Sequence, residues 1–309
     1  MKPKIFIDGR EGTTGLEINE RLNARYDISL LTISDNDRKD PKVRKKCINK
    51  ADLVFLCLPD DAARESVSFI ENNDTRVIDA STAHRTNPDW VYGFPELTKK
   101  RRDEICNARF VANPGCHATG FISAVYPLIA MGVMPLDYPL TCLSLTGYSG
   151  GGKGMIKMYE ERKTPEMYSP RMYGLEQRHK HLPEIMKVTG LTRSPVFCPV
   201  VGDFYSGMAT TVTLHNDMLP GKPTAEDIRQ KLESYYKGEL FITVLPELGS
   251  GFLESNWGVN SNMLEITVSG GAKLTMVTAR FDNLGKGASG AAVQNMNIML
   301  GFDEGEGFA

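Results

Sequence analysis

Gly9-Arg10-Glu11-Gly12-Thr13-Thr14-Gly15 is the stretch that decides the fold, since it joins the apolar residues 4–8 to a helical segment ending near residue 25. Glycines after a strand let the backbone turn tightly and approach a diphosphate, which the free N–H groups of the next helix can bind. The spacing is GxxGxxG rather than the commoner GxGxxG, and an ordinary strand-to-helix turn would look similar. The position in the first strand–helix turn favours a dinucleotide site. We expect five residues of this turn to contact the cofactor: Gly9, Gly12, Thr13, Thr14 and Gly15.

Strand-like and helical segments alternate through the first third of the chain. Residues 28–33, 51–58, 77–80 and 110–112 are apolar, and residues 60–72 resemble a helix with Asp60 as its N-cap. The continuous apolar run 51–58 ends at Pro59, which is typical of a strand buried on both faces. The alternation predicts an α/β domain of Rossmann-like type, with a parallel sheet covered by helices on both faces.

The middle of the chain has a different pattern. Residues 140–146, 196–201, 209–215, 263–268 and 273–281 are strand-like, and several alternate with a period of two. Such alternation suits an antiparallel or mixed sheet with one solvated face. Residues 224–236 resemble a helix, and residues 285–301, rich in Gly, Ala and Asn, resemble a final, closely packed helix. The second domain is therefore expected to be α+β.

Composition excludes several classes of protein. The 309 residues are 41% hydrophobic and carry a net charge of −2, so we expect no nucleic acid and no membrane partner. The longest apolar stretch, residues 121–134, is shorter than the ~20 residues that a membrane span needs. The N-terminal apolar run is too short for a signal peptide. The six cysteines show no paired spacing, which favours free thiols and a cytoplasmic protein.

The residues after the second predicted strand bear on the type of cofactor. Asp35 lies about 20 residues beyond the glycines, where an acid usually binds the ribose hydroxyl of NAD. Ser34, Arg38 and Lys39 beside it suit a 2′-phosphate instead. Residues 35–50 could also be a solvated charged loop. We favour NADP, with Ser34 and Arg38 as binding residues.

Asn113-Pro114-Gly115-Cys116-His117 follows a strand and precedes the apolar helix that begins near Ala118. A thiolate is stabilised at a helix N-terminus, and the Pro-Gly turn can present the sulfur. A buried structural cysteine is the alternative, and we expect it for the other five. For Cys116 the turn favours a catalytic nucleophile.

A thiolate nucleophile needs an acid–base partner, and the best source is His179-Lys180-His181-Leu182-Pro183-Glu184. If residues 179–181 are extended, both imidazoles point to the same side, and Pro183 is the first residue of a helix. Surface or core histidines are an equally good reading of these two residues alone. No third ligand stands at metal spacing, so we expect no metal site.

Together these motifs resemble the N-acetyl-gamma-glutamyl-phosphate reductase family, in particular its shorter subfamily, and more distantly aspartate-semialdehyde dehydrogenase. The resemblance spans nearly the whole chain. Its marks are the glycine turn with Asp8, Leu56-Cys57-Leu58-Pro59-Asp60, Asp79-Ala80-Ser81-Thr82-Ala83-His84-Arg85, Tyr92-Gly93-Phe94-Pro95-Glu96-Leu97, Asn113-Pro114-Gly115-Cys116, Ser149-Gly150-Gly151-Gly152-Lys153, the histidine segment and Asp282-Asn283-Leu284-Gly285-Lys286-Gly287-Ala288-Ser289-Gly290. The longer subfamily usually has an aromatic residue and a proline after the nucleophile, whereas His117 and Ala118 follow here.

The resemblance implies a homo-oligomeric enzyme, dimeric or tetrameric, that acts on a small-molecule acyl phosphate with NADPH. Cys116 would form a thioester, and His179 or His181 would transfer protons. It further implies a cofactor domain of residues 1–116 with 286–309, and a catalytic and dimerisation domain of residues 117–285. Another acyl-phosphate reductase, such as an aspartate-semialdehyde dehydrogenase, is the nearest alternative.

Further site residues are expected from the shared motifs. The remaining cofactor contacts are Pro59, Ser81, Asn283 and Gly285, the last two at the nicotinamide end. The substrate contacts are Arg85, Asn113, Ser149 and Glu184. Among these, the guanidinium of Arg85 suits the leaving phosphate because it can bind two oxygens at once.

Overall fold

The computed structural model describes residues 2–246 and 251–308, and the chain divides into two compact units. The first consists of Met1–Pro114 and Ala288–Ala309, and the second of Gly115–Gly287. The chain therefore passes from one unit to the other twice, once just before Cys116 and once after Gly287.

The first unit is built on a six-stranded sheet in the order β2-β1-β3-β4-β6-β5, in which every pair of neighbours is parallel. Its strands are β1 (Lys4–Asp8), β2 (Ser29–Leu31), β3 (Leu53–Leu56), β4 (Arg76–Asp79), β5 (Val91–Tyr92) and β6 (Phe110–Ala112). Its helices are α1 (Thr13–Asn23), α2 (Pro41–Ile48), α3 (Asp60–Ser68), α4 (Arg101–Asn107) and α9 (Gly290–Leu300), with a 3₁₀ turn η1 (Pro95–Leu97). The predicted Rossmann-like sheet is confirmed.

Alternation along the strands of the first unit buries both faces of the sheet. Ile5 and Phe55 pack with residues of α1, α4 and α9, among them Ile18, Ile105 and Met296. Phe6 and Val54 point the other way, into a second cluster that includes residues of α2 and α3. A strand covered on both sides must be apolar throughout, which explains the continuous run in β3.

One detail of the sequence analysis is wrong in this unit. Asp60 is the first residue of α3, and Pro59 is its N-cap. The Asp60 carboxylate instead accepts hydrogen bonds from the backbone N–H of Thr82 (3.0 Å) and from its hydroxyl (2.5 Å). It therefore joins two loops at the carboxyl edge of the sheet.

The second unit holds a seven-stranded mixed sheet in the order β11-β12-β13-β10-β7-β9-β8. Its strands are β7 (Thr141–Gly147), β8 (Arg171–Met172), β9 (Val196–Gly202), β10 (Met208–His215), β11 (Ile242–Val244), β12 (Leu264–Gly270) and β13 (Leu274–Phe281). Its helices are α5 (Cys116–Ala130), α6 (Gly152–Glu161), α7 (Leu182–Thr189) and α8 (Ala225–Tyr235), with 3₁₀ turns η2 (Tyr148–Gly151), η3 (Pro165–Tyr168) and η4 (Asn216–Met218). Only the β11–β12 and β7–β9 pairs are parallel, so the predicted mixed sheet is confirmed.

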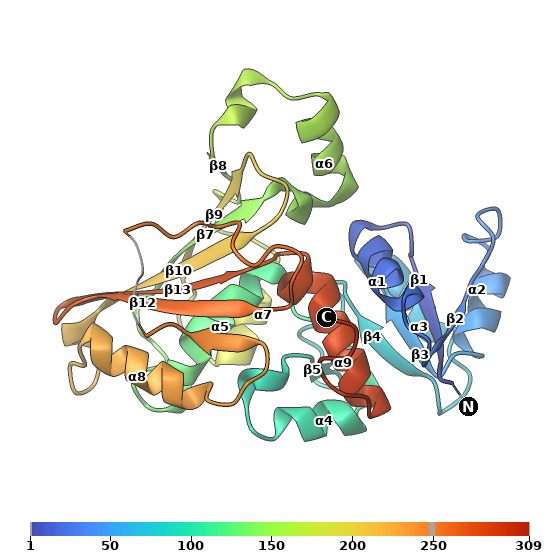
Figure 1. Cartoon of the computed structure of the whole chain (residues 1–309), viewed down its shortest axis with the longest axis horizontal. Helices are drawn as coiled ribbons and strands as arrows, with labels where there is room; N and C mark the ends of the chain where they lie inside the picture. Colours follow the sequence, from blue (N-terminus) through green and yellow to red (C-terminus); the bar gives the residue numbers. More distant parts are fainter. Residues whose placement is uncertain (1, 247–250, 309) are drawn as a thin grey trace. The chain divides into compact units, whose positions relative to one another are not determined.

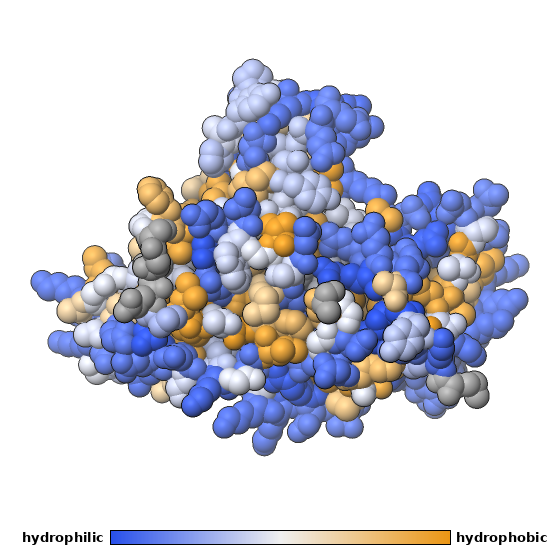
Figure 2. All heavy atoms as spheres, in the orientation of Figure 1, coloured by the Kyte–Doolittle hydropathy of each residue, from blue (hydrophilic) through white to orange (hydrophobic). Residues whose placement is uncertain are grey.

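The apolar helix α5 packs against β10 and β13, with α7 and α8 beside it (Figure 1). The packing is close at Gly120, where a Cβ atom would lie 2.4 Å from Thr210 Oγ1. The last predicted helix begins with a π-helical turn, η5 (Gly285–Ser289), before α9. Polar residues cover most of the visible surface, and the apolar residues lie in small separate groups (Figure 2). No helix within residues 2–246 and 251–308 is long and apolar enough to span a membrane.

Candidate functional site

The glycine turn between β1 and α1 is held by close backbone contacts. Gly9 has a φ of +87°, and a Cβ there would lie 2.4 Å from Cys57 O, the carbonyl oxygen after β3. A Cβ on Gly15 would lie 2.5 Å from Gly9 O, whereas Gly12 has more room. Gly9 and Gly15 are therefore required by the turn itself. Gly12 is the N-cap of α1 and has no capping side chain, so the N-terminus of α1 keeps donors for a ligand.

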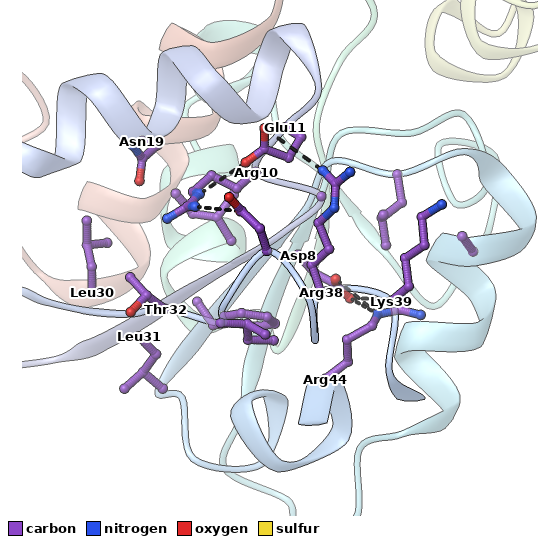
Figure 3. A pocket seen from close by; sticks show the side chains of 17 residues that line it. Asp8, Arg10, Glu11, Asn19, Leu30, Leu31, Thr32, Arg38, Lys39 and Arg44 are labelled. Atoms are coloured by element: carbon purple, nitrogen blue, oxygen red, sulfur yellow. Dashed lines mark hydrogen bonds and ion pairs between the residues drawn. The ribbon is translucent and has the colours of Figure 1, made fainter. Parts of the chain in front are cut away.

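A cavity of about 340 Å³ in the first unit lies beside this turn (Figure 3). Gly9, Arg10 and Glu11 line it together with residues 30–33 at the end of β2. The buried hydroxyl oxygen of Thr13, at the start of α1, has no hydrogen-bond partner in the part of the chain that the structure describes. A buried polar atom without a partner is costly, so a polar ligand at this end of α1 would satisfy it.

Three cationic side chains, Arg10, Arg38 and Lys39, lie around the cavity (Figure 3). Arg10 Nη2 is 3.7 Å from Asp35 Oδ1, and Arg38 Nη1 is 4.0 Å from Glu11 Oε2. The Asp35 side chain is 80% exposed. These are loose, solvated ion pairs, which an incoming anion can replace at little cost.

Ser34 is not among the residues that line this cavity. Its hydroxyl donates to Asp37 Oδ2 at 2.8 Å and accepts from the N–H of Asp37. This arrangement closes a turn of the loop after β2. A contact of Ser34 with the cofactor remains a prediction.

A buried ion pair fixes the carboxyl end of β1. Asp8 accepts hydrogen bonds from Arg44 Nε and Nη2 at 3.1–3.3 Å and from Ser66 Oγ at 2.8 Å. Burial alone would lower the pKa of Arg44, but its hydrogen bonds and its attraction to Asp8 and Glu65 outweigh burial and raise the pKa. The sequence analysis missed this pair because Arg44 lies in a charged stretch that looked solvated.

The carboxyl end of β4 carries a second polar cluster. Asp79 accepts from the N–H of Ser81 (2.9 Å) and from its hydroxyl (2.8 Å), and lies 2.6 Å from His84 Nδ1. The His84 ring stacks on Trp90, with the centroids 4.0 Å apart. Ser81 is thus held rigidly at the sheet edge near Pro59, where its role toward a cofactor is still a prediction.

Arg85 and Asn113 brace the ends of β4 and β6. Arg85 donates from Nε to Asn113 O (2.9 Å) and from Nη2 to Ala80 O (3.0 Å). The Asn113 amide donates to Ala288 O at 2.9 Å and accepts from Asn295 Nδ2 at 3.2 Å. Both side chains are buried, so part of the hydrogen-bonding capacity of each serves the fold, and their contacts with substrate remain predictions.

Cys116 is the first residue of α5, with Gly115 as N-cap. The Gly115 N–H donates to Glu184 Oε1 at 2.8 Å, which ties the turn before Cys116 to α7. A Cβ on Gly287 would lie 2.9 Å from Cys116 Cβ. The residue at the second crossing between the units is therefore required to be glycine. Cys116 is partly exposed, whereas burial raises the pKa of three other thiols: Cys47, Cys57 and Cys142. None of the six cysteines forms a disulfide within the described residues.

The imidazoles of His179 and His181 lie close together, as predicted, but the extended backbone that was expected to bring them together is not present. Residues 180 and 181 form a turn, and His181 has helical backbone angles (φ −83°, ψ −14°), so the segment is not extended. The turn leaves the two ring centroids 4.9 Å apart. Burial, with a smaller effect of Lys180, lowers the pKa of His179 to about 4. The imidazole is therefore a neutral base at physiological pH.

His117, next to Cys116, lies against both of these rings, with centroid distances of 5.3 Å to His179 and 5.4 Å to His181. Its Nδ1 is 2.7 Å from Ser144 Oγ and its Nε2 is 2.7 Å from Tyr173 OH. Burial, together with His179 and Lys180, lowers its pKa to about 3. The structure thus supplies a third imidazole, which contradicts the premise that no third ligand is near.

Tyr173 also belongs to this cluster. Burial and the charge of Cys116 raise its pKa, so the phenol stays protonated within electrostatic reach of the sulfur. Sequence reasoning missed Tyr173 and His117, since neither stands in a spacing that signals a partner. The adjacency of His117 to Cys116 was the one available clue.

Ser149 and Asn283 lie together in the second unit. Asn283 Nδ2 donates to Ser149 Oγ (3.0 Å), and its Oδ1 accepts from the N–H of Gly207 (2.7 Å). A Cβ on Gly285 would lie 2.0 Å from Ser261 O, so this residue must be glycine for packing. Contacts of these residues with ligands remain predictions.

Comparison with known proteins identifies relatives over the whole length. The family models "Semialdehyde dehydrogenase, NAD binding domain" and "Semialdehyde dehydrogenase, dimerisation domain" match residues 4–107 and 116–283. N-acetyl-gamma-glutamyl-phosphate reductase 2 of Nostoc sp. is 47% identical, with 98% of each chain covered. The protein of that name from Pseudomonas putida is 45% identical, with 97% of each covered.

Solved structures share the fold at much lower identity. Aspartate semialdehyde dehydrogenase II of Vibrio cholerae has a TM-score of 0.74 at 14% identity, over 97% of this chain and 98% of that one. The Candida albicans aspartate semialdehyde dehydrogenase, solved with NADP, has a TM-score of 0.71 at 16% identity, over 97% and 99%. At these identities the likeness supports the architecture alone.

Proposed function

This chain belongs to the semialdehyde dehydrogenase family, in its N-acetyl-gamma-glutamyl-phosphate reductase branch, and we propose on that premise that it reduces N-acetyl-L-glutamyl 5-phosphate to N-acetyl-L-glutamate 5-semialdehyde. The observation that carries the proposal is the near full-length match to reductases of that name at 45–47% identity. The partly exposed Cys116 at the start of α5 supplies the nucleophile that such a reaction needs.

The proposed chemistry begins at Cys116. Its thiolate attacks the acyl carbon, and the carbon–oxygen bond to phosphate breaks. Inorganic phosphate departs, and the acyl group remains on the sulfur as a thioester. NADPH, when bound, supplies the hydride that reduces this thioester. Collapse of the resulting hemithioacetal expels the thiolate and releases the semialdehyde. The imidazoles of His179 and His181 lie close together in the turn before α7. One of them takes up and returns the proton that these steps require.

The nucleotide cavity suits a cofactor with a diphosphate. The N-terminus of α1, the glycines that bring the backbone close and the unpartnered Thr13 hydroxyl would hold the phosphates. The cavity is lined by the cationic side chains of Arg10, Arg38 and Lys39. These charges favour NADPH over NADH, because the 2′-phosphate of NADPH carries about two negative charges. We assign cofactor binding to the first unit and the thioester chemistry to the second.

We also propose that the chain forms a homo-oligomer, either a dimer or a tetramer. The matching family model of the second unit is described as a dimerisation domain. One face of its sheet carries the exposed apolar side chains of Leu143, Val196 and Met276. The strand register puts these three on the same face. An apolar sheet face of this kind suits a subunit interface, and light scattering would report two or four times the mass of one chain.

The decisive test is run in the reverse direction. N-acetylglutamate 5-semialdehyde, phosphate and NADP are mixed with enzyme, and the nicotinamide absorbance is followed. We expect phosphate-dependent turnover that is lost in Cys116→Ser and kept in Cys106→Ser, a change at an exposed cysteine of the other unit. Turnover with aspartate semialdehyde, and none with the acetylated compound, would refute the proposed substrate but leave the proposed thioester chemistry in place. No turnover with either would reject the proposal.

A further inference from the structure

The three imidazoles of the second unit form a cluster with the composition of a metal site. His117, His179 and His181 each offer one ring nitrogen, and the three nitrogens all lie within 4.8 Å of one another. Ligand nitrogens on a tetrahedral zinc ion, with bonds of about 2.0–2.1 Å, are about 3.3 Å apart. The nitrogens of each pair would have to approach by at most about 1.5 Å, and rotation of the partly exposed His179 side chain can contribute to this approach.

His117 already has the support that a metal-binding histidine usually has. Its Nδ1 contacts Ser144 Oγ at 2.7 Å, and that oxygen contacts Thr210 Oγ1 at 2.8 Å. When Nδ1–H donates to Ser144, Nε2 carries a lone pair that can bind a cation. The chain of hydroxyl groups thus holds the ring in place and is compatible with the tautomer that leaves Nε2 as the acceptor.

Tyr173 is the group that a metal ion would displace. Its hydroxyl lies 2.7 Å from His117 Nε2 and, in the tautomer with the proton on Nδ1, donates to the lone pair of Nε2. The phenol competes with the metal, so it lowers the affinity of the cluster without abolishing it. Removal of the Tyr173 hydroxyl should therefore strengthen metal binding. If the cluster were only a structural hydrogen-bond network, the same change would loosen it and would not strengthen metal binding.

We propose that His117, His179 and His181 form an inhibitory site for a divalent transition metal ion of the zinc class. Three imidazole nitrogens and no carboxylate favour Zn²⁺, Co²⁺ or Ni²⁺ over Mg²⁺ or Ca²⁺, which prefer oxygen ligands. Binding itself is independent of the proposed reductase function. The inhibition rests on that function, because the metal would occupy both imidazoles that are offered as the acid–base group.

The experiment is a titration of the full-length, EDTA-treated and dialysed protein with Co²⁺, followed by visible absorption, and then with Zn²⁺ in competition. We expect one Co²⁺ per chain, with intense tetrahedral bands that Zn²⁺ removes. His117→Gln and His179→Gln should each weaken binding at least about 100-fold. The control is His215→Gln, at an exposed histidine at the end of β10, and it should leave binding unchanged. Tyr173→Phe should tighten binding about fivefold, as expected for the loss of one competing hydrogen bond.

The absence of these bands in the wild-type protein would overturn the proposal, as would bands that persist in both His117→Gln and His179→Gln. Circular dichroism of each variant shows whether it is folded, and the wild-type titration decides the matter if a variant is not. Inhibition is measured separately, as the Zn²⁺ concentration that halves each variant's own rate. A protein that binds Co²⁺ but has no reductase activity would reject the proposed function and leave the metal site standing.

Discussion

Removal of the Arg38 charge is the sharpest test of how the nucleotide cavity selects its cofactor. The Arg38 side chain is 49% exposed, and its nearest acid, Glu11, is 4.0 Å away. Two unit charges about 4 Å apart interact by about 1 kcal/mol in bulk water and about 4 kcal/mol near a protein surface. A half-exposed guanidinium falls between these limits, and some of its attraction is already spent on Glu11. We take about 2 kcal/mol for its contact with the 2′-phosphate, which is about a 30-fold change in affinity.

Arg38→Gln is therefore expected to raise the KM for NADP about 30-fold and to change the KM for NAD less than twofold. Initial rates at several concentrations of each nucleotide, with semialdehyde and phosphate saturating, measure both values. Lys45→Gln is the matched control, because Lys45 is a solvated cation of α2 that pairs with Glu71 and does not line the cavity. The effect on NADP should also shrink as salt is raised. Equal losses with both nucleotides, or no loss with either, would refute the assignment of Arg38 to the 2′-phosphate.

Three further predictions follow from the geometry. Gly15→Ala should destabilise the chain by about 1–3 kcal/mol and weaken nucleotide binding, because its Cβ meets Gly9 O; in thermal melts Gly154→Ala, which meets nothing within 4 Å, should be neutral or stabilising. Arg44→Met should cost about 3–5 kcal/mol in urea unfolding by leaving Asp8 buried and unpaired, and adding Asp8→Asn should recover much of it; a strictly additive double variant would contradict the ion pair. If His179 is the base, its pKa of about 4 keeps it neutral as pH falls, so kcat/KM of EDTA-treated enzyme should persist well below pH 6.5 and decline toward pH 4; a midpoint near 6.5 would exclude it.

The parts of the fold that sequence predicts well are those set by local contacts. The glycine turn is one, because Gly9 has a positive φ within the turn itself and a Cβ on Gly15 would meet Gly9 O of the same turn. The strands are another, since Ile5 and Phe6 alternate between two buried faces as the pattern requires. The residue that caps a helix is predicted less well. Asp60 fits an N-cap by residue type, yet its carboxylate binds Thr82 across the sheet edge, a contact that no local pattern encodes.

The parts that sequence predicts poorly depend on tertiary contacts. Arg44 stands among lysines that are solvated, and only the packing of α2 beside β1 reveals that its guanidinium is buried against Asp8. His117 is hidden for the same reason, because its neighbours come from β7, from the segment after β8 and from the turn before α7. The histidines of residues 179–181 converge through a turn, so an argument from strand periodicity reached the right neighbours by the wrong route.

Cys116, the proposed nucleophile, lies directly after the first of the two points at which the chain passes between units. Asn113 and Ala288 are hydrogen-bonded within the first unit, and Cys116 and Gly287 are in contact within the second. The outgoing and returning segments are thus neighbours on each side of the boundary. Glu184 of α7 accepts a hydrogen bond from the Gly115 N–H, so a side chain of the second unit helps to position the start of α5. Because α7 begins directly after His181, this hydrogen bond ties the turn before Cys116 to the segment that carries both imidazoles proposed as the acid–base group.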